Sequence, residues 1–430
     1  MNTQTEQLID SLNDRDRETR LSALGSLVAA GGLTQLPWSE EVNNHVHTRY
    51  SFSPYSPAAV AYHARVAGLR VVGSVDHESI GAAEEMKEAA ALLGMGATVG
   101  CEVRVSFKDT GFADRRLNNP DTIGNAYMVI HAVPARSIPA LAKRLAPLNT
   151  AREERNRRQV DRLNGVIHAE LGSLDYDRKV RPLSWADDGG SVTERHILYA
   201  LALRVLEAVP RADRIGLFLD DRLGLKVPDL IRDRIQDESN PHRAYDLLGA
   251  FKADFVPQFF EQPGEVECPP VREITTLARD IGAIPAYAYL GDVGESPTGD
   301  KKAQFFEDAY ADQLFAALPE LGYQAVTYMP PRNTKAQLKR VQKLAAAYGL
   351  MEISGVDINS SRQSFRCPEV LQPEFRHLIE NTWALVGHEA TTATDITKGI
   401  FGTVDDGKTL EQRITHFSQI ARESMQAGLP

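Results

Sequence analysis

HVHTRYS, residues 45–51, places two histidines one residue apart at the end of a short apolar segment near 43–47. Residues two apart on a strand project from the same face, roughly 6–7 Å apart at the backbone, so both imidazoles can reach one ion. The pair alone is as compatible with surface or core packing as with metal binding, because short motifs also match by chance. The surrounding sequence has to decide between the two.

Outward from this stretch, short apolar segments alternate with helical patterns, which predicts an α/β fold with a parallel sheet. We expect seven strands, near 43–47, 69–75, 97–107, 126–133, 282–290, 324–329 and 350–356. Long charged helices fill residues 151–270 and predict an inserted helical cap. The expected organisation is therefore an N-terminal helical extension, a barrel in two parts around the cap, and a C-terminal helical extension: 1–36, 37–150, 151–270, 271–368 and 369–430.

Composition limits the classes of function. The 430 residues are 43% hydrophobic and 25% charged, with no apolar run long enough for a bilayer and no leader pattern, so we expect a soluble, cytoplasmic protein without a membrane partner. The three cysteines form no CxxC pair, and we expect reduced thiols. A net charge of −10 disfavours long nucleic acid and favours a small phosphorylated substrate or nucleotide.

Ligand-type side chains fall where the predicted strands end. In parallel α/β folds the reacting groups gather at the C-terminal ends of strands. The candidates are His45, His47, Asp76, His77, His131 and Asp357 at strand ends and Glu102 within the third strand. Imidazoles and carboxylates suit zinc, manganese or iron, which lower the pKa of bound water from 15.7 to about 7. The joint pattern predicts metal-assisted hydrolysis.

Each candidate also has a plainer explanation. Asp76 could cap the helix that begins soon after it. Glu102 could be a solvated strand residue, and His131 a hydrogen-bonded core histidine. Only the combination of these residues on one rim favours a metal site over these alternatives.

The sequence resembles the PHP family, the polymerase and histidinol phosphatase superfamily of metal-dependent phosphoesterases. The likeness spans about residues 40–365, and its motifs are HVHTRYS, VDHES, GCEVRV, AYMVIHAVP and GVDIN, with REERNRRQVDRLNGVI and TERHILYALAL in the cap. It implies a distorted seven-stranded β/α barrel with up to three metal ions.

The resemblance also implies roles for single residues. His45, His47, Glu102 and Asp357 would hold the first ion, and Glu102 would bridge to a second that His131 helps to bind. His77 and Asn359 would contribute to a third position. Asp76 and His196 are then the predicted catalytic residues, and four further residues are predicted to contact substrate: Arg195, Arg332, Arg362 and Tyr289.

Three departures from the family pattern reduce the predicted site. Tyr289 replaces a histidine, Asn359 replaces a histidine, and Phe52-Ser53 stand where an acidic or imidazole ligand is usual. Neutral tyrosine and asparagine are weaker ligands. We therefore expect one firmly bound divalent ion, with a second as the open alternative. Tyr127 is the alternative to His131, which we prefer because it lies nearer the C-terminal end of its strand.

Arginines on the first cap helix leave two alternatives open. Arg152, Arg155, Arg158 and Arg162 share one face, and interleaved acids favour a solvated, salt-bridged helix over a phosphate clamp. Cys101 should pack on the strand face opposite to Glu102.

The leading hypothesis is a metal-dependent phosphoesterase that hydrolyses a small phosphate ester or nucleotide with metal-activated water. The second is a PHP-derived protein with reduced or lost hydrolysis that acts as a binding or regulatory module. Hydrolysis of a non-phosphate ester or amide at the same metal is the third.

Overall fold

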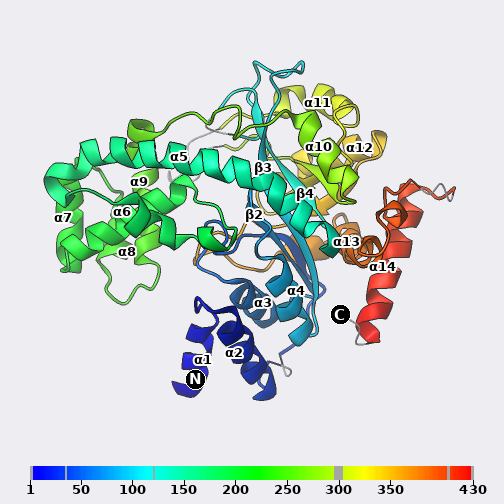
Figure 1. Cartoon of the computed structure of the whole chain (residues 1–430), viewed down its shortest axis with the longest axis horizontal. Coiled ribbons are helices and arrows are strands. Elements are labelled where there is room, and N and C mark those ends of the chain that lie inside the picture. The colour runs from blue at the N-terminus through cyan, green and yellow to red at the C-terminus, as the bar shows by residue number, and fades with distance from the viewer. Residues whose placement is uncertain (1–2, 34–35, 120–121, 295–303, 404–406, 428–430) are drawn as a thin grey trace.

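A computed structural model describes residues 3–33, 36–119, 122–294, 304–403 and 407–427. Seven strands form one sheet in sequential order. Their bounds are β1 (Val42–Val46), β2 (Val71–His77), β3 (Gly96–Ser106), β4 (Asn125–His131), β5 (Ile284–Ala288), β6 (Ala325–Tyr328) and β7 (Met351–Ser354). The sheet curls into a nearly closed barrel (Figure 1), so the predicted α/β class with seven strands is confirmed.

The predicted all-parallel sheet is corrected at one strand. β4 runs antiparallel to both β3 and β5, whereas every other neighbouring pair is parallel. Parallel neighbours need a crossover connection, usually a helix, and residues 107–124 between β3 and β4 contain no helix among those described. The start of β4, not its end, therefore lies at the same barrel mouth as the ends of the other strands.

The barrel closes between β1 and the segment after β7. Val46 forms an isolated parallel bridge with Ile358. The Ile358 N–H donates to the His45 carbonyl at 3.1 Å, and the His47 N–H donates to the Ile358 carbonyl at 3.0 Å. The two histidines of the HxH pair are thus fixed by backbone hydrogen bonds that also join the first strand to the last.

Helices surround the barrel. The outer layer consists of α3 (Pro57–Val66), α4 (Ala83–Leu92), α10 (Val271–Asp280), α11 (Ala311–Ala317) and α12 (Lys335–Ala347). Short turns of 3-10 or π helix lie between them, at Ala135–Ser137, Tyr176–Val180, Arg181–Leu183, Ala186–Asp188, Asp308–Tyr310, Pro368–Leu371 and Ile396–Lys398. Apolar faces of the helices join the strands in one continuous core.

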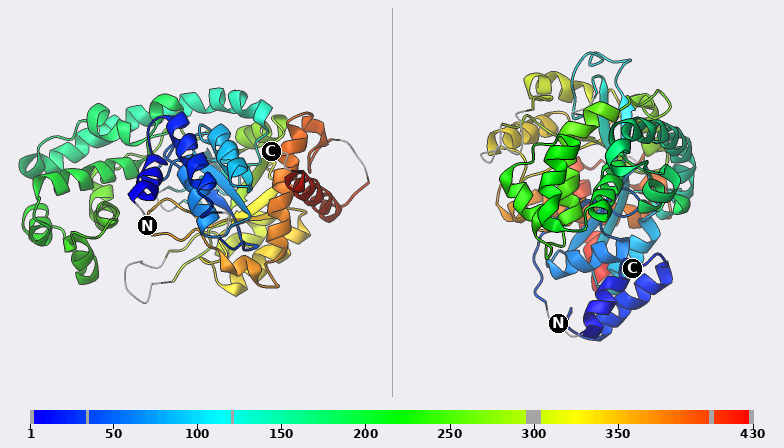
Figure 2. Two further views of the ribbon diagram at one scale, coloured as in Figure 1. Left: turned by 90° about the horizontal axis from the view of Figure 1, so that it is seen from below. Right: turned by 90° about the vertical axis from the view of Figure 1, so that its left-hand side faces the viewer.

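The cap projects to one side of the barrel (Figures 1 and 2). It comprises the outer part of α5 (Ile138–Leu171), then α6 (Glu194–Ala208), α7 (Ala212–Leu223), α8 (Asp229–Gln236) and α9 (Arg243–Phe259). These helices bury a hydrophobic cluster of their own. The predicted boundary at residue 151 falls inside α5, because this single helix begins beside the barrel and continues through the cap.

The terminal helices pack against the barrel. α1 (Thr3–Ser11) and α2 (Arg17–Ala29) lie beside α3 and α4, where the buried Arg20 side chain pairs with the buried carboxylate of Glu85. α13 (His377–Thr392) covers the sheet and α14 (Leu410–Gln426) packs on α13. Glu389 of α13 accepts a hydrogen bond from the Val99 N–H at 2.8 Å. Within the described residues, no helix has the length and apolar character needed to cross a membrane.

The Arg20–Glu85 pair should dominate the anchoring of the N-terminal helices. Both side chains are only 1% exposed, so Arg20→Met would leave a buried carboxylate without its cation. We expect the free energy of unfolding to fall by about 3–5 kcal/mol, measured by urea denaturation. Arg20→Met combined with Glu85→Gln should recover most of this loss. Arg17→Met is the control, since its surface pairs with Glu84 and Glu88 contribute about 0–1 kcal/mol. Equal losses in the two single variants would contradict the assignment.

Candidate metal centre

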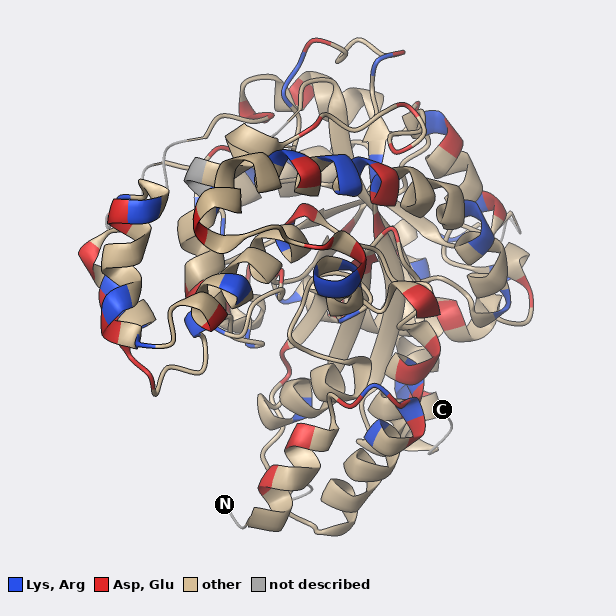
Figure 3. Cartoon of the chain, turned by 60° about the vertical axis from the view of Figure 1, so that its left-hand side comes forward, with Lys and Arg blue, Asp and Glu red and all other residues tan. Residues whose placement is uncertain are grey.

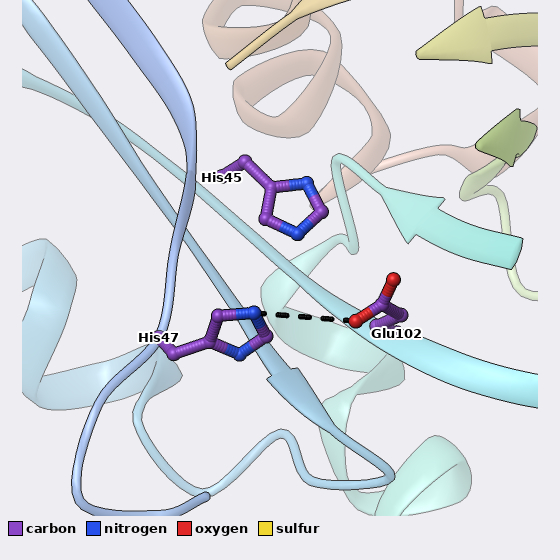
Figure 4. A group of neighbouring side chains, drawn as sticks. All are labelled: His45, His47 and Glu102. Atoms are coloured by element: carbon purple, nitrogen blue, oxygen red, sulfur yellow. Dashed lines mark ion pairs between the residues drawn. The ribbon is translucent and has the colours of Figure 1, made fainter. Parts of the chain in front are cut away.

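Two imidazoles and one carboxylate converge inside the barrel mouth. One ligand atom from each of His45, His47 and Glu102 lies within 4.8 Å of the other two. Figure 4 shows the two rings and the carboxylate turned toward a common space. All three side chains are buried. This is the donor set that zinc, manganese and iron accept in proteins.

Two further predicted residues join this triad. The His47 Nε2 atom lies 3.3 Å from Asp357 Oδ1 and 4.0 Å from Glu102 Oε2. His77 Nδ1 lies 3.0 Å from Glu102 Oε2, and its ring stacks on that of His47 with centroids 4.6 Å apart. The structure therefore brings His45, His47, His77, Glu102 and Asp357 together, as predicted from the strand ends.

The electrostatics of these groups favour charged carboxylates. Burial would raise the pKa of Glu102, but His77 and then the other histidines outweigh burial and bring this pKa to about 2. Burial would also raise the pKa of Asp357, and the hydrogen bond from His47 reverses the shift, so this pKa lies well below its usual range. Burial lowers the pKa of His45, only partly offset by Glu102 and Asp357. Both carboxylates are thus anionic at neutral pH.

A cavity of about 270 Å³ lies over the centre and beneath the cap. Four cationic and three acidic side chains line it, although the whole chain carries a net charge of −10. Figure 3 shows charges of both signs distributed over the barrel and the cap. The charged lining residues are Arg104, Arg152, Arg195, Lys252, Glu102, Glu194 and Asp357, and apolar ones from the cap are Leu198, Val256 and Phe260.

Gly355, in the GVDIN stretch, allows β1 to approach the segment after β7. A Cβ atom at this position would lie 2.5 Å from the His45 Cβ and 2.6 Å from the His45 nitrogen. Atoms cannot approach so closely, so a side chain here would push His45 away from Asp357. The glycine is required for the two halves of the ligand set to meet.

Asp76 does not line the cavity and instead holds the loop after β1. Its carboxylate accepts hydrogen bonds from the Thr48 N–H and hydroxyl and from the Ser51 hydroxyl, each at 2.6 Å. The Ser51 Oγ lies 3.3 Å from His47 Nδ1. Because the only Ser51 hydroxyl proton goes to Asp76, Ser51 Oγ accepts from His47 Nδ1–H, and the other ring nitrogen, Nε2, faces Asp357 and Glu102. The structure thus places Asp76 where it supports His47, and its predicted catalytic role stays a prediction.

His196 likewise has a structural position. Its Nδ1 accepts from the Thr193 N–H at 2.9 Å in a capping box of α6, and its Nε2 donates to the Ser51 carbonyl at 3.0 Å. Burial lowers its pKa to about 3, so the ring is neutral. His196 is absent from the cavity lining, and both nitrogens have partners. Its hydrogen bonds join the cap to the loop after β1, and its predicted catalytic role stays a prediction.

Phe52, at the place where the family has another ligand, is part of the same junction. Its ring contacts His196 and Tyr199 of α6 and Tyr245 of α9, with centroid distances of 5.1, 5.8 and 5.8 Å. The Ser191 N–H donates to the Tyr50 carbonyl at 2.7 Å. Phe52 therefore joins the loop after β1 to two helices of the cap.

The reversed direction of β4 changes the choice between His131 and Tyr127. Tyr127 pairs with Arg104 and lines the cavity. His131 lies about four residues deeper on the same strand face, is 1% exposed, and is not part of the cavity lining. Burial lowers its pKa to about 3, and its Nε2 has no hydrogen-bond partner among the described residues. The premise that His131 lies at the mouth was wrong, and the mouth residue is Tyr127.

The remaining predicted site residues divide into two groups. Arg195 and Tyr289 line the cavity, with the Tyr289 hydroxyl donating to Asp308 at 2.5 Å. Asn359, Arg332 and Arg362 do not. Asn359 donates its amide N–H to Asp357 at 2.6 Å, Arg332 donates to the Leu290 carbonyl at 3.1 Å, and Arg362 pairs with Asp246 of the cap at 2.6 Å.

The arginine face of α5 is only half solvated, which corrects the preferred prediction. Arg158 and Arg162 are exposed and pair with Glu261. Arg152 and Arg155 are 3% and 1% exposed, and Arg152 lines the cavity. Sequence reasoning missed Arg104 as a site residue. The available signal was its position two residues after Glu102, which places both on one face of β3.

Gly355→Ala should separate the ligands without unfolding the protein. We expect the affinity for zinc or manganese to fall by at least about 10-fold. Loss of a group that orients a metal ligand has an effect of this size, and displacement of His45 would disturb the ligand geometry in the same way. Metal binding by calorimetry and far-ultraviolet circular dichroism would measure the two effects. Gly165→Ala, in α5, is the control, since nothing lies within 4 Å of its added Cβ. Unchanged metal affinity in Gly355→Ala would contradict the proposed closure.

Asp76→Asn tests the positioning of His47 through Ser51. The amide cannot replace a carboxylate that accepts three hydrogen bonds, so His47 should lose its fixed tautomer and orientation. We expect metal affinity to fall about 10- to 100-fold. Ser51→Ala should reproduce most of this loss. If Asp76→Asn binds metal normally and Ser51→Ala does not, the connection through Asp76 is refuted.

Comparison with known proteins gives structural neighbours but no sequence relatives. No family model and no curated protein matches the sequence. A crystal structure from Bifidobacterium adolescentis, provisionally described as a metal-dependent phosphoesterase, has 18% identity and a TM-score of 0.49 over 78% of this chain and 96% of that one. An amidohydrolase from Chromobacterium violaceum, with bound sulfate and no metal, has 16% identity and a TM-score of 0.50 over 79% and 95%. At such identity the second likeness shows a shared fold.

Proposed function

We propose that this chain is a metal-dependent hydrolase of PHP type that cleaves a small phosphate ester. The observation that carries the proposal is the His45, His47 and Glu102 triad beneath a cavity whose lining includes four cationic side chains. An amide or neutral ester would gain little from these cations, whereas a phosphate dianion would gain much.

The residues present fit a divalent ion. Two buried imidazoles and an anionic carboxylate converge, with Asp357 beside His47 and His77 beside Glu102. When bound, such an ion activates water at neutral pH and neutralises charge on the phosphoryl oxygens. Water would form the new bond to phosphorus, the ester P–O bond would break, and the leaving oxygen would take a proton, giving an alcohol and phosphate.

The chain's own residues would orient the substrate. Arg195 lines the cavity close enough to Asp357 that its charge lowers the Asp357 pKa, against the effect of burial and after the larger contributions of His47 and His45. A guanidinium in this place can hold phosphoryl oxygens through its planar fork. The cavity of about 270 Å³ lies just below the range of pockets for drug-sized ligands, which supports a small substrate.

A binding or regulatory module is the second candidate. It is favoured by the positions of the two substituted ligands, because Asn359 donates to Asp357 and Tyr289 donates to Asp308. Both side chains are thus hydrogen-bonded to carboxylates of this chain. Hydrolysis decides between the two candidates.

Purified protein should hydrolyse 4-nitrophenyl phosphate, or a member of a nucleotide and sugar-phosphate panel, after addition of manganese, zinc or iron. His45→Ala combined with His47→Ala should lower the rate more than about 100-fold, since two ligands of the ion are lost. His416→Ala, outside the barrel interior, is the matched histidine control.

No phosphate release with any metal, while metal still binds, would favour the binding module. Release of 4-nitrophenol from an acetate ester but not from the phosphate would instead favour non-phosphate ester hydrolysis.

A further inference from the structure

Arg104 is a cavity residue outside the metal centre. It stands two residues beyond Glu102 on β3, so both side chains face the barrel interior, with roughly 6–7 Å between their backbone positions. Arg104 lines the same cavity as Glu102 and is 5% exposed. Its position is on the side of the centre nearest to the cap.

The Arg104 guanidinium is incompletely bonded. Nη2 lies 2.9 Å from the Tyr127 hydroxyl. Nε and Nη1 have no hydrogen-bond partner among the described residues. The nearest carboxylate oxygens belong to Glu267 at 3.9 Å and Glu194 at 4.0 Å, beyond hydrogen-bonding distance. Buried donors without partners are rare and unfavourable.

Neighbouring arginines already occupy these carboxylates. Arg155 binds Glu267 through two contacts of 2.7 and 2.9 Å and also lies 2.7 Å from Glu194. Arg152 pairs with Glu78. Among Arg104, Arg152 and Arg155, Arg104 is therefore the one whose guanidinium donates no hydrogen bond to a carboxylate of the described residues.

We propose that Arg104, held by Tyr127, binds a carboxylate of the substrate on the cap side of the metal centre. The proposal rests on the proposed function, because it assigns the phosphate ester to the metal centre and a second, non-reacting group to Arg104. The substrate class is then a small phosphorylated carboxylic acid.

The charges around Arg104 favour a carboxylate over a second phosphate. Burial would raise the pKa of Glu194, but Arg155 and Arg104 bring it well below its usual range, so Glu194 is anionic. Glu194 and Glu267 therefore already compensate much of the Arg104 charge. A monoanion adds less repulsion against them than a phosphate dianion, and a carboxylate matches the flat guanidinium fork.

Two phosphonates that cannot be hydrolysed test this assignment by binding. 2-Carboxyethylphosphonate carries the proposed second group, and propylphosphonate is its counterpart without a carboxylate. Calorimetry with the metal-loaded protein should show about 10- to 100-fold tighter binding of the carboxylated compound, as for one charged hydrogen-bonded pair. Arg104→Met should abolish this preference, and Arg104→Lys should restore only part of it. Arg162→Met, an exposed arginine of α5, should keep it.

Several outcomes would overturn the proposal. These are equal binding of both compounds by the unsubstituted protein, and equal weakening of both by Arg104→Met, which would indicate a merely structural role. Tighter binding of propane-1,3-diphosphonate than of the carboxylated compound would assign a second phosphate instead. Tyr127→Phe retains the charge of Arg104 and should lower the preference, so a preference unaffected by this variant would contradict the role of Tyr127.

Hydrolysis separates this proposal from the proposed function. 3-Phosphoglycerate should be cleaved with a higher kcat/KM than glycerol 3-phosphate, and the difference should lie mainly in KM. A retained binding preference without phosphate release under any metal would refute hydrolysis and leave the Arg104 assignment standing. Hydrolysis without discrimination between the two esters would refute the Arg104 assignment alone.

Discussion

The backbone of Ile358 is the element on which the rest of the site depends. Its N–H donates to the His45 carbonyl and its carbonyl accepts from the His47 N–H, so the same residue closes the barrel and fixes both histidines. Gly355 permits the approach, since any side chain there would meet His45. Asp357 lies between Gly355 and Ile358 in the sequence, so the closure of the barrel also brings its carboxylate next to His47. Folding of the barrel and assembly of the ligand set are therefore one event.

The loop after β1 connects this centre to the cap. Ser51 uses its side chain toward Asp76 and His47 and its carbonyl toward His196. Phe52 packs on both α6 and α9. This loop is therefore held by His47 on one side and by the cap on the other.

Much of this arrangement follows from sequence. Strand periodicity and the positions of His45, His47, Glu102 and Asp357 were sufficient to predict one metal centre at one barrel mouth. Periodicity reports which face a side chain occupies, but it carries no information about strand direction, and so His131 was placed at the mouth instead of Tyr127. The contacts of Asp76 with Thr48 and Ser51, and of His196 with Thr193, could not be predicted, because they depend on loop geometry. Arg104 escaped notice because a buried and a solvated arginine look alike in a strand sequence.

The single helix α5, 34 residues long, joins barrel and cap without a break. Successive residues of a helix are turned by about 100°, so the number of residues between the barrel and Arg152 sets the direction in which that arginine points. One residue inserted in this interval would rotate the whole cap around the helix axis and carry Arg152 and Arg155 away from Glu78 and Glu267. Insertions and deletions can therefore be tolerated in the cap loops, whereas the number of residues in α5 between the barrel and Arg152 has to stay the same.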